Sequence, residues 1–480
     1  MTEISFEGRG RLARTPAHDV ALDCLAAGVA AALPERTIDE RVSVDDGALR
    51  IDAVDGETAE YDLDTYDAVR LVGAGKAAGG TGRALADALG DRPGGGAVVT
   101  TDPDAGSESL PFEVLPGDHP LPSDRGVAST RRVIEVAESA GTDDLVVAVV
   151  TGGGSALLAA PADPLTVEDL RALTDELLAC GASIDEINAV RKHCSAVKGG
   201  RLARIAAPAT VVTLAVSDVI GDDVGVIASG PTAPDPSTYA EALAVCDRYD
   251  LDLPAAVREH LRAGVAGERA ETPTASDPAF DRTRTLVVGN GRSALDAAAS
   301  AAAERGYDPV VLAAGVRGES REAALTHVAI GEECSASGSP ASPPCVLLSG
   351  GETTVTLGDS PGRGGPNTEF ATSAGIALAT ATDADRSTRI VVASVDTDGI
   401  DGTSGAAGGI VDATTFDDAT LDTDDATPPD DVTTLDTDAA RAALDRNDVA
   451  PLLAEADALV RTGPTGTNVN DLRVLVVDEA

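Results

Sequence analysis

Short apolar runs, each followed by glycine or a polar cluster, recur along the first half of the chain. Four of them are long enough for buried strands: 66–72, 97–101, 144–150 and 209–216. Strands that are apolar on both faces are typical of a parallel sheet covered by helices on either side. Segments with apolar residues at helical spacing lie before and between these runs, beginning with 17–33. The pattern therefore predicts an α/β fold built on a central parallel sheet.

The second half repeats this alternation after a polar stretch. Residues 265–283 are rich in Pro, Thr, Ser and Asp and are predicted to form a linker. Further strands are predicted at 285–288, 309–313, 345–349, 389–394 and 472–477. Residues 413–437 are rich in Asp and Thr, which predicts a solvated surface excursion. A chain of 480 residues exceeds one ordinary core, so we predict two domains, 1–265 and 284–480.

Acidic residues dominate the charge of the chain. Asp plus Glu number 80 and Lys plus Arg 36, which gives a formal net charge of −44. Such a surface repels phosphate backbones, so no nucleic-acid partner is expected. Carboxylates spread along the whole chain, with very little lysine, indicate a surface adapted to high salt, where self-repulsion is screened over short distances. We therefore expect a halophilic protein from a salt-rich cytoplasm.

Targeting and redox signals agree with a cytoplasmic location. No apolar run reaches the length of about eighteen residues that a membrane helix needs, and the first residues lack a signal sequence. The six cysteines are scattered without CxxC spacing, which indicates free thiols in a reducing compartment. We expect no contact with a membrane, and the oligomeric state, including a homodimer, stays open.

Only three lysines occur in the chain: Lys76, Lys192 and Lys198. Lysine is a compact point charge, whereas arginine presents a wide planar fork, so each lysine is predicted to meet an anion. One face of a predicted helix carries Asn188, Arg191, Lys192 and Ser195, and Lys198 follows three residues later. This set favours an anion-binding face over a solvated one. Chance placement is the alternative reading.

Two glycine-rich turns follow predicted strands. Gly73–Gly79 contains Gly75 and Lys76, and Thr151–Ser155 contains Gly153, Gly154 and Ser155. Exposed backbone N–H groups at a strand end or a helix N-terminus are suited to bind phosphate or carboxylate. The first turn is not a Walker P-loop. It matches a dinucleotide fingerprint only loosely, because no acidic residue closes a second strand at the expected distance. Tight turns without a ligand are the alternative.

Other candidates lie at the ends of further predicted strands. Asp218 follows 209–216 directly and could hold Mg²⁺ or accept a hydroxyl proton. Three carboxylates at 396–402, including Asp398, fit either Mg²⁺ coordination or a structural loop. His119 lies in a proline-dense loop, where a site role and a structural role are equally plausible. Asn290, Glu352, Arg363 and Asn367 each occur in or beside a glycine cluster.

Taken as a set, these motifs resemble one family. They are GAGKAA (73–78), GDHPLP (117–122), GGGSALL (152–158), NAVRKHCSAVKGGRLA (188–203), SDVIGDDVGVIASGPT (217–232), GGETT (350–354), GRGGPNTE (362–369), TDGIDG (397–402) and GPTGTNVND (463–471). The chain resembles the glycerate 2-kinase family with a C-terminal MOFRL domain, some members of which are named hydroxypyruvate reductase. The resemblance spans nearly the whole chain in family order.

The resemblance implies ATP-dependent phosphorylation of D-glycerate, usually at the 2-hydroxyl, with a divalent metal such as Mg²⁺. It also implies a larger, Rossmann-like N-terminal domain with a parallel sheet and a C-terminal α/β MOFRL domain, with the active site in the cleft between them. The family's active-site lysine falls on Lys76 and the arginine of its glycine-rich loop on Arg363. Pro366 and Thr368 depart from the family, which usually has arginine and glutamine there.

We accordingly expect Lys76, Arg363 and Asp218 to be catalytic. The residues expected to bind substrate or nucleotide are Gly75, Gly153, Gly154, Ser155, Asn188, Arg191, Lys192, Lys198, Asn290, Glu352 and Asn367. Asp218 and Asp398 are the expected metal ligands. Which loop holds nucleotide phosphates and which holds the glycerate carboxylate stays open. The alternatives are an NAD(P)-dependent hydroxypyruvate reductase and a binding protein without catalysis.

Overall fold

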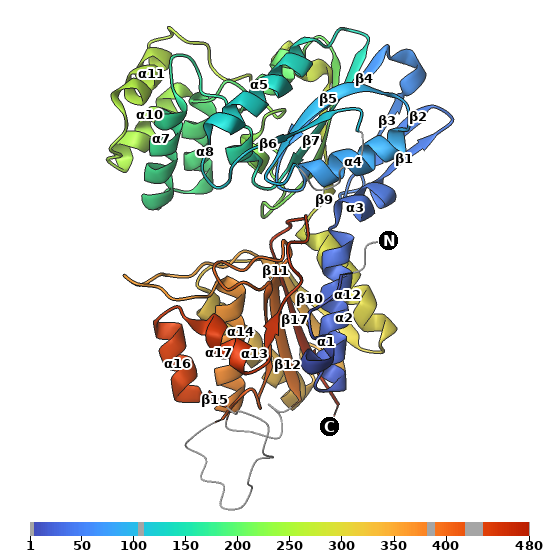
Figure 1. Cartoon of the computed structure of the whole chain (residues 1–480), viewed down its shortest axis with the longest axis vertical. Helices are drawn as coiled ribbons and strands as arrows, with labels where there is room; N and C mark the ends of the chain where they lie inside the picture. The colour runs from blue at the N-terminus through green and yellow to red at the C-terminus, as the bar shows by residue number, and fades with distance from the viewer. Residues whose placement is uncertain (1–3, 104–109, 382–388, 418–434, 480) are drawn as a thin grey trace, which may run out of the picture. The chain divides into compact units, whose positions relative to one another are not determined.

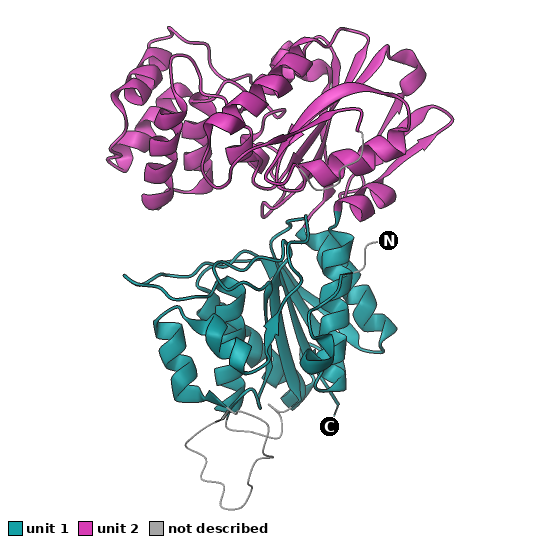
Figure 2. Ribbon diagram, in the orientation of Figure 1, with its two compact units in different colours: residues 1–33, 291–480 teal, residues 34–290 magenta. Residues whose placement is uncertain are grey.

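The computed structural model describes residues 4–103, 110–381, 389–417 and 435–479. The chain divides into two compact units (Figure 2). Unit 1 comprises residues 1–33 and 291–480, and unit 2 comprises residues 34–290. Each unit is an α/β structure with a six-stranded main sheet, as the sequence predicted.

The main sheet of unit 2 is parallel throughout. Its strands lie in the order β6-β5-β4-β7-β8-β9, with these bounds: β4 Ala68–Ala74, β5 Pro93–Thr100, β6 Glu113–Pro116, β7 Asp144–Thr151, β8 Thr210–Val216 and β9 Thr283–Gly289. Numbered along the chain within this sheet, the order is 3-2-1-4-5-6, the arrangement of dinucleotide-binding folds. The order reverses between β4 and β7, and ligands of such sheets bind outside the carboxyl ends of the strands at that point.

Helices cover both faces of this sheet. α5 (Asp124–Glu138) and α9 (Arg201–Ala206) pack against alternate strand residues such as Val72 on one face. α4 (Ala78–Leu89) lies against Leu71, whose side chain points to the other face. The fully buried strand β7 explains its continuous apolar run.

Two smaller parts complete unit 2. β1 (Val42–Asp45), β2 (Ala48–Asp52) and β3 (Thr58–Asp62) form an antiparallel sheet, and Asp46 and Gly47 have the positive φ angles of a two-residue hairpin turn. Four helices form a separate lobe with its own apolar core beside the sheet (Figure 1). They are α7 (Val167–Ala179), α8 (Ile184–His193), α10 (Tyr239–Arg248) and α11 (Ala255–Val265). Outside this lobe, α3 (Pro34–Arg41) packs against α4.

The main sheet of unit 1 is mixed. Its order is β10-β11-β17-β12-β13-β16, and only β10 and β11 pair in parallel. The bounds are β10 Asp308–Val316, β11 Cys345–Gly351, β12 Ile390–Asp396, β13 Gly408–Asp412, β16 Leu459–Val460 and β17 Asp471–Val477. β17 runs antiparallel between β11 and β12, so the carboxyl ends of β11 and β12 lie at the same edge as the start of β17.

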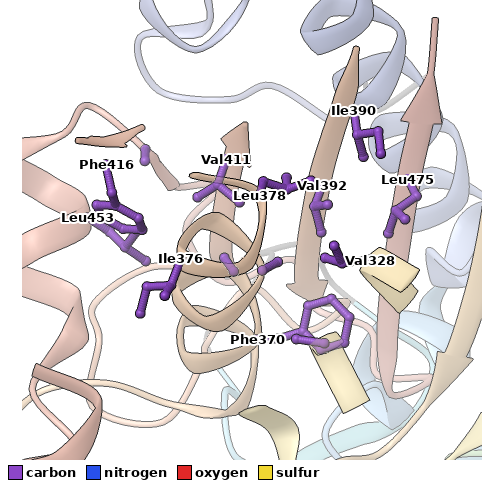
Figure 3. Close-up of a cluster of buried hydrophobic side chains, with 14 of the residues drawn as sticks. Val328, Phe370, Ile376, Leu378, Ile390, Val392, Val411, Phe416, Leu453 and Leu475 are labelled. Carbon is purple, nitrogen blue, oxygen red and sulfur yellow. The ribbon is translucent and has the colours of Figure 1, made fainter. Parts of the chain in front are cut away.

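Alternate residues of these strands build two cores. α2 (Pro16–Ala31) and α12 (Gly291–Glu304) cover one face, where they meet Val474 and Val476 of β17. α13 (Ser320–Ser337) and α14 (Pro366–Ala379) cover the other face, together with α16 (Thr437–Asp445) and α17 (Val449–Glu455). Figure 3 shows this second core, to which α14 contributes Phe370 and Ile376 and the sheet contributes Val392 and Leu475.

Two expected domain boundaries are wrong. Residues 1–33 were predicted in the first domain, but α2 packs against α12 and β17 in unit 1. Residues 285–288 were predicted to open the second domain, but β9 is the edge strand of the unit 2 sheet. Apolar spacing shows that a helix or strand buries a face; it does not show which sheet receives that face.

Two further expectations concern connecting segments. The predicted linker 265–283 contains a short 3₁₀ helix at Pro278–Arg282 and joins α11 to β9 within unit 2. Of the predicted excursion at 413–437, residues 418–434 lie outside the described residues. Among the described residues no single helix is long and apolar enough to cross a membrane, and only the bent pair Pro16–Ala31 and Pro34–Arg41 reaches that length together.

Gly28 tests the place of α2 in unit 1. A Cβ at Gly28 would lie 2.4 Å from Leu472 Cδ2 and 2.9 Å from the carbonyl oxygen of Ala294. Gly28→Ala is therefore expected to lower the free energy of unfolding by about 1–3 kcal/mol through overpacking. The matched control is Gly10→Ala in the short helix Arg9–Leu12, where no atom lies within 4 Å of the added Cβ. Denaturant unfolding of both variants is the measurement, and equal stability would contradict the packing of α2.

Candidate functional site

The two glycine-rich turns of unit 2 lie side by side at the carboxyl ends of β4 and β7. The backbone N–H of Lys76 donates to the carbonyl of Gly152 (2.8 Å), and the N–H of Ala77 donates to Thr151 Oγ1 (3.2 Å). α4 begins two residues after Lys76, and the short helix α6 (Gly154–Leu157) begins in the second turn. The structure thus brings Lys76 and the predicted glycines to the point where the strand order reverses.

Space around these turns allows no side chain at three positions. A Cβ at Gly75 would lie 2.0 Å from Thr151 Oγ1, and one at Gly152 would lie 2.5 Å from Asp218 Oδ2. A Cβ at Gly153, which has a φ of +77°, would lie 3.1 Å from both His119 Cδ2 and Lys76 Cγ. Glycine is required here because the backbone passes so close to its neighbours.

Asp218 joins this group from the end of β8. It is half-buried, and burial raises the pKa of its carboxyl above the ordinary value. Three effects limit this rise in pKa: a hydrogen bond from the backbone N–H of Asp218 itself, the positive charge of Lys76, and a hydrogen bond from the backbone N–H of Gly153. Asp218 is therefore a carboxylate with raised basicity next to a lysine, which is an arrangement suited to accept a proton.

The residues that were expected on one helix face do not all lie on that helix. α8 ends at His193, so Ser195 and Lys198 lie beyond the helix. Lys192 is buried, and its Nζ donates to Asp235 Oδ1 (3.1 Å) in an internal ion pair. Burial alone would raise the pKa of Asp235, but Lys192 and Ser237 outweigh it and leave the pKa low. Lys192 thus has a structural partner, and its contact with a ligand stays a prediction.

Asn188 and Ser155 belong to one hydrogen-bond chain. Ser229 Oγ donates to Asn188 Oδ1 (2.8 Å) and lies 2.8 Å from Ser155 Oγ. Ser229 and Ala228 both have positive φ angles, +62° and +50°. Such strain in residues other than glycine is concentrated at functional sites. The sequence did not single out Ser229, because serine rarely adopts this conformation and nothing in its neighbours signals it.

A cavity of about 220 Å³ lies beside the Gly152–Ser155 turn, wholly within unit 2. Its wall is formed by His119, Pro120, Pro122, Gly153, Ser155, Ala156, Ala159, Ala160, Leu170, Leu173, Thr174, Leu178, Arg191, Ser195 and Lys198. Arg191 and Lys198 are its cations. Four of the expected binding residues (Gly153, Ser155, Arg191 and Lys198) therefore meet at one cavity, together with His119.

The surroundings of Lys198 disfavour the charged form of its amine. Its side chain is buried, and its Nζ donates to the carbonyl of Leu158 (3.0 Å). Burial, and secondly the charge of Arg191, lower the pKa of Lys198 to about 7. A bound anion would reverse this effect and favour the protonated amine.

The predicted residues of unit 1 lie around the start of α14. Arg363 is exposed; its backbone N–H donates to Asp448 Oδ1 (2.9 Å), and Nη2 reaches the carbonyl of Ser404 (3.4 Å). Pro366 occupies the first helical position, where proline is favoured because its missing N–H is not needed. The departure from the family at Pro366 therefore fits the helix start.

Asn367 and Asp401 hold that helix start in place. Asp401 accepts from the backbone N–H groups of Asn367 (2.8 Å) and Thr368 (2.9 Å) and from Thr368 Oγ1 (2.7 Å). Burial raises the pKa of Asp401 to about 6, and these hydrogen bonds limit the rise. Asn367 Nδ2 donates to Asp471 Oδ1 (2.6 Å), and Ser394 donates to Asn367 Oδ1. Asn367 is thus committed to protein partners at both ends of its amide.

The remaining expected residues are distributed over both units. Asn290 follows β9 in unit 2 and donates from Nδ2 to Asp222 Oδ2 (2.6 Å). Glu352 is exposed after β11 in unit 1. Asp398 is buried, and its Oδ1 accepts from the backbone N–H of Ile400 (2.8 Å), which is the geometry of a side-chain turn. The carboxylates at 396–402 therefore support the structural-loop alternative by their geometry.

Lys198 predicts a specific pH dependence of stability. Its pKa is about 7 in the folded chain and 10.5 ordinarily, so between those values the unfolded chain holds a proton that the native chain lacks. Wild type should gain stability over Lys198→Met as pH rises through this window, by about 1.4 kcal/mol per pH unit, and the difference should level off below it. Denaturant unfolding of both proteins across the window is the measurement. Parallel stability curves would refute the low pKa.

Comparison with known proteins gives the family. Residues 20–262 match DUF4147, a domain of unknown function, and residues 345–471 match the MOFRL family. A Pyrococcus horikoshii protein named glycerate 2-kinase is 34% identical over 462 residues, covering 96% of this chain and 97% of that protein.

Two further proteins agree on the family and differ in name. An Agrobacterium vitis protein with the provisional name hydroxypyruvate reductase is 41% identical over 411 residues, covering 85% of this chain and 86% of that protein. The crystal structure of glycerate kinase from Thermotoga maritima matches with a TM-score of 0.78 at 34% identity, over 96% of this chain and 99% of that chain. The chain therefore belongs to the glycerate kinase family that combines a DUF4147 domain with a MOFRL domain.

Proposed function

We propose that this protein is an ATP-dependent glycerate kinase that converts D-glycerate into 2-phosphoglycerate. The observation that carries the proposal is the meeting of Lys76, Asp218 and the Gly152–Gly154 turn at the carboxyl ends of β4, β7 and β8. The names of the Pyrococcus horikoshii and Thermotoga maritima relatives support the substrate.

The roles follow from the chemistry of phosphoryl transfer. The reaction depends on positioning and on neutralising charge at the transferred group, with no covalent nucleophile on the protein. Lys76 would contact the transferring phosphoryl group, and the backbone N–H groups of the Gly152–Gly154 turn would hold phosphate oxygens. Arg363 of unit 1 is proposed as a catalytic cation because it matches the arginine of the family's glycine-rich loop.

Asp218 is proposed as the general base. The 2-hydroxyl oxygen of glycerate attacks the γ-phosphorus of ATP while the bond to the bridging oxygen breaks and ADP leaves. Asp218 takes the hydroxyl proton and later releases it to water. Its raised pKa makes it a stronger base than an ordinary aspartate, and Lys76 keeps it ionised.

A divalent metal is compatible with these residues. The described residues contain no group of three or more His, Cys, Asp or Glu side chains arranged to hold a metal. Kinase sites usually hold Mg²⁺ through one or two carboxylates together with substrate phosphates, so Asp218 alone fits that mode. Bound Mg²⁺ would supply charge neutralisation on the phosphates. Asp398 is the weaker candidate, because its Oδ1 already accepts from Ile400.

A hydroxypyruvate reductase is the second candidate. Two observations favour it: the name of the Agrobacterium vitis relative and the 3-2-1-4-5-6 strand order of unit 2. Purified protein with hydroxypyruvate and NADH or NADPH distinguishes the two by absorbance. Oxidation of the nicotinamide without ADP release would establish the reductase and refute the kinase.

The kinase proposal predicts glycerate-dependent ADP release with ATP and Mg²⁺ in high salt, with 2-phosphoglycerate as the product. Lys76→Ala should lower kcat about a hundredfold or more, because a cation at the transition state is lost. Lys76→Arg should restore little, since the guanidinium has a different shape. The control is Arg132→Ala on α5, whose exposed side chain pairs with Glu113 and Glu135. Unchanged turnover in Lys76→Ala would remove Lys76 from the mechanism.

We also propose that the protein works in a salt-rich cytoplasm. With a net charge of −44, self-repulsion at low ionic strength opposes the compact state. Dialysis from molar KCl into dilute buffer should therefore reduce both the circular dichroism signal of the fold and the activity, reversibly on return of salt. Full activity in dilute buffer would contradict this adaptation.

A further inference from the structure

The wall of the unit 2 cavity combines apolar and polar side chains. The apolar ones include Leu170, Leu173 and Leu178 of α7, together with Ala159 and Pro122. The polar ones include Ser155, Ser195, Arg191 and Lys198, none of which belongs to α7. A mostly apolar wall with a few convergent polar groups is typical of small-molecule sites.

The cavity wall adjoins the residues proposed for phosphoryl transfer at Gly153. Gly153 belongs to the cavity wall, and a Cβ there would lie 3.1 Å from Lys76 Cγ. The backbone N–H of the same Gly153 bonds to Asp218. A ligand that fills the cavity would therefore end next to Lys76 and Asp218.

The apolar part of the wall suits only one of the two proposed substrates. Glycerate carries an oxygen on each carbon and has no apolar face to place against leucine side chains. A nucleotide has a flat base with two apolar faces, joined through ribose to phosphates. The cavity volume of about 220 Å³ is below the range of about 300–1,000 Å³ that is typical of pockets for whole ligands, so it can hold part of a nucleotide with the phosphates outside.

The exposure of Leu178 also favours a nucleotide base as the ligand of this cavity. It lines the cavity, yet its side chain is 57% exposed. A base placed against it would remove that apolar surface from water, which stabilises binding by about 25 cal/mol per Å² buried. Arg191, close enough to Lys198 to lower its pKa, is the second cation of the cavity and offers a planar group for stacking or for an α-phosphate.

We propose, resting on the kinase activity proposed above, that this cavity of unit 2 binds the base and ribose of the nucleotide and directs its phosphates to the Gly152–Gly154 turn. Glycerate then occupies a different position, next to Asp218. The proposal decides between nucleotide and glycerate for the loops around Ser155, Arg191 and Lys198.

A matched pair of variants tests the apolar part of the cavity wall. Leu178→Asp places a carboxylate on the cavity wall, whereas Ile184→Asp changes an equally exposed apolar side chain (51%) of the same helical lobe that does not line the cavity. Titration calorimetry with ADP on the full chain should show at least tenfold weaker binding for Leu178→Asp and wild-type binding for Ile184→Asp. Thermal unfolding of both variants reports whether the fold is kept.

A second variant fills the cavity itself. Leu170 is half-buried in the cavity wall on α7 and does not belong to the Gly152–Gly154 turn, so Leu170→Trp would place a larger side chain in the space for the base. Wild type should bind ADP far more tightly than inorganic pyrophosphate, which has no base. Leu170→Trp should bring ADP down to the pyrophosphate level and leave pyrophosphate binding unchanged. Equal loss of both probes would refute the assignment.

Three outcomes separate this inference from the proposed activity. Loss of glycerate affinity, measured as KM, with unchanged ADP binding in Leu170→Trp would assign the cavity to glycerate and overturn the inference while the kinase stands. Unchanged binding of both would also overturn it. If wild type binds ADP in the cavity but releases no ADP with glycerate and ATP, the inference holds and the proposed substrate fails.

Discussion

The close approach of the turns after β4 and β7 is the constraint on which the candidate site depends. At Gly75 any side chain would collide with Thr151, and at Gly152 with Asp218. Because the two backbones pass without side chains between them, Lys76 N–H can reach the carbonyl of Gly152. Lys76 and Asp218 are then neighbours although they come from different strands. The strained backbone of Ala228 and Ser229 packs against the same turn at Gly154.

Charge is distributed very unevenly in this chain. The surface is acidic, while the scarce lysines are buried or half-buried in unit 2. Lys192 is neutralised by Asp235, whereas burial and, secondly, the charge of the neighbouring Arg191 lower the pKa of Lys198. Unit 1 shows the same principle in Arg473, which is buried, pairs with Asp471 and lies over the Phe370 ring. Cations retained inside an acidic protein attract anionic ligands to a few positions.

Several parts of the fold were accessible from local pattern. The apolar runs at 66–72, 144–150 and 209–216 became β4, β7 and β8, because strands buried on both faces must be apolar throughout. The glycine-rich turns were placed correctly at strand ends. The end of α8 was not predicted correctly. Ser195 continues the helical spacing, yet the helix stops at His193. Helix ends depend on tertiary contacts, here on residues that continue into a buried turn.

The sequence by itself determined the α/β class, the turns that carry Lys76 and Gly153, and, through its motifs, the family. These features depend on short-range periodicity and on residue types that few other conformations accept. Tertiary structure alone decided that residues 1–33 pack in unit 1 and that β9 closes the sheet of unit 2. It also decided that Lys192 faces Asp235 while Lys198 faces a cavity. Those outcomes depend on which buried faces meet across long stretches of chain, and periodicity along the sequence does not contain that choice.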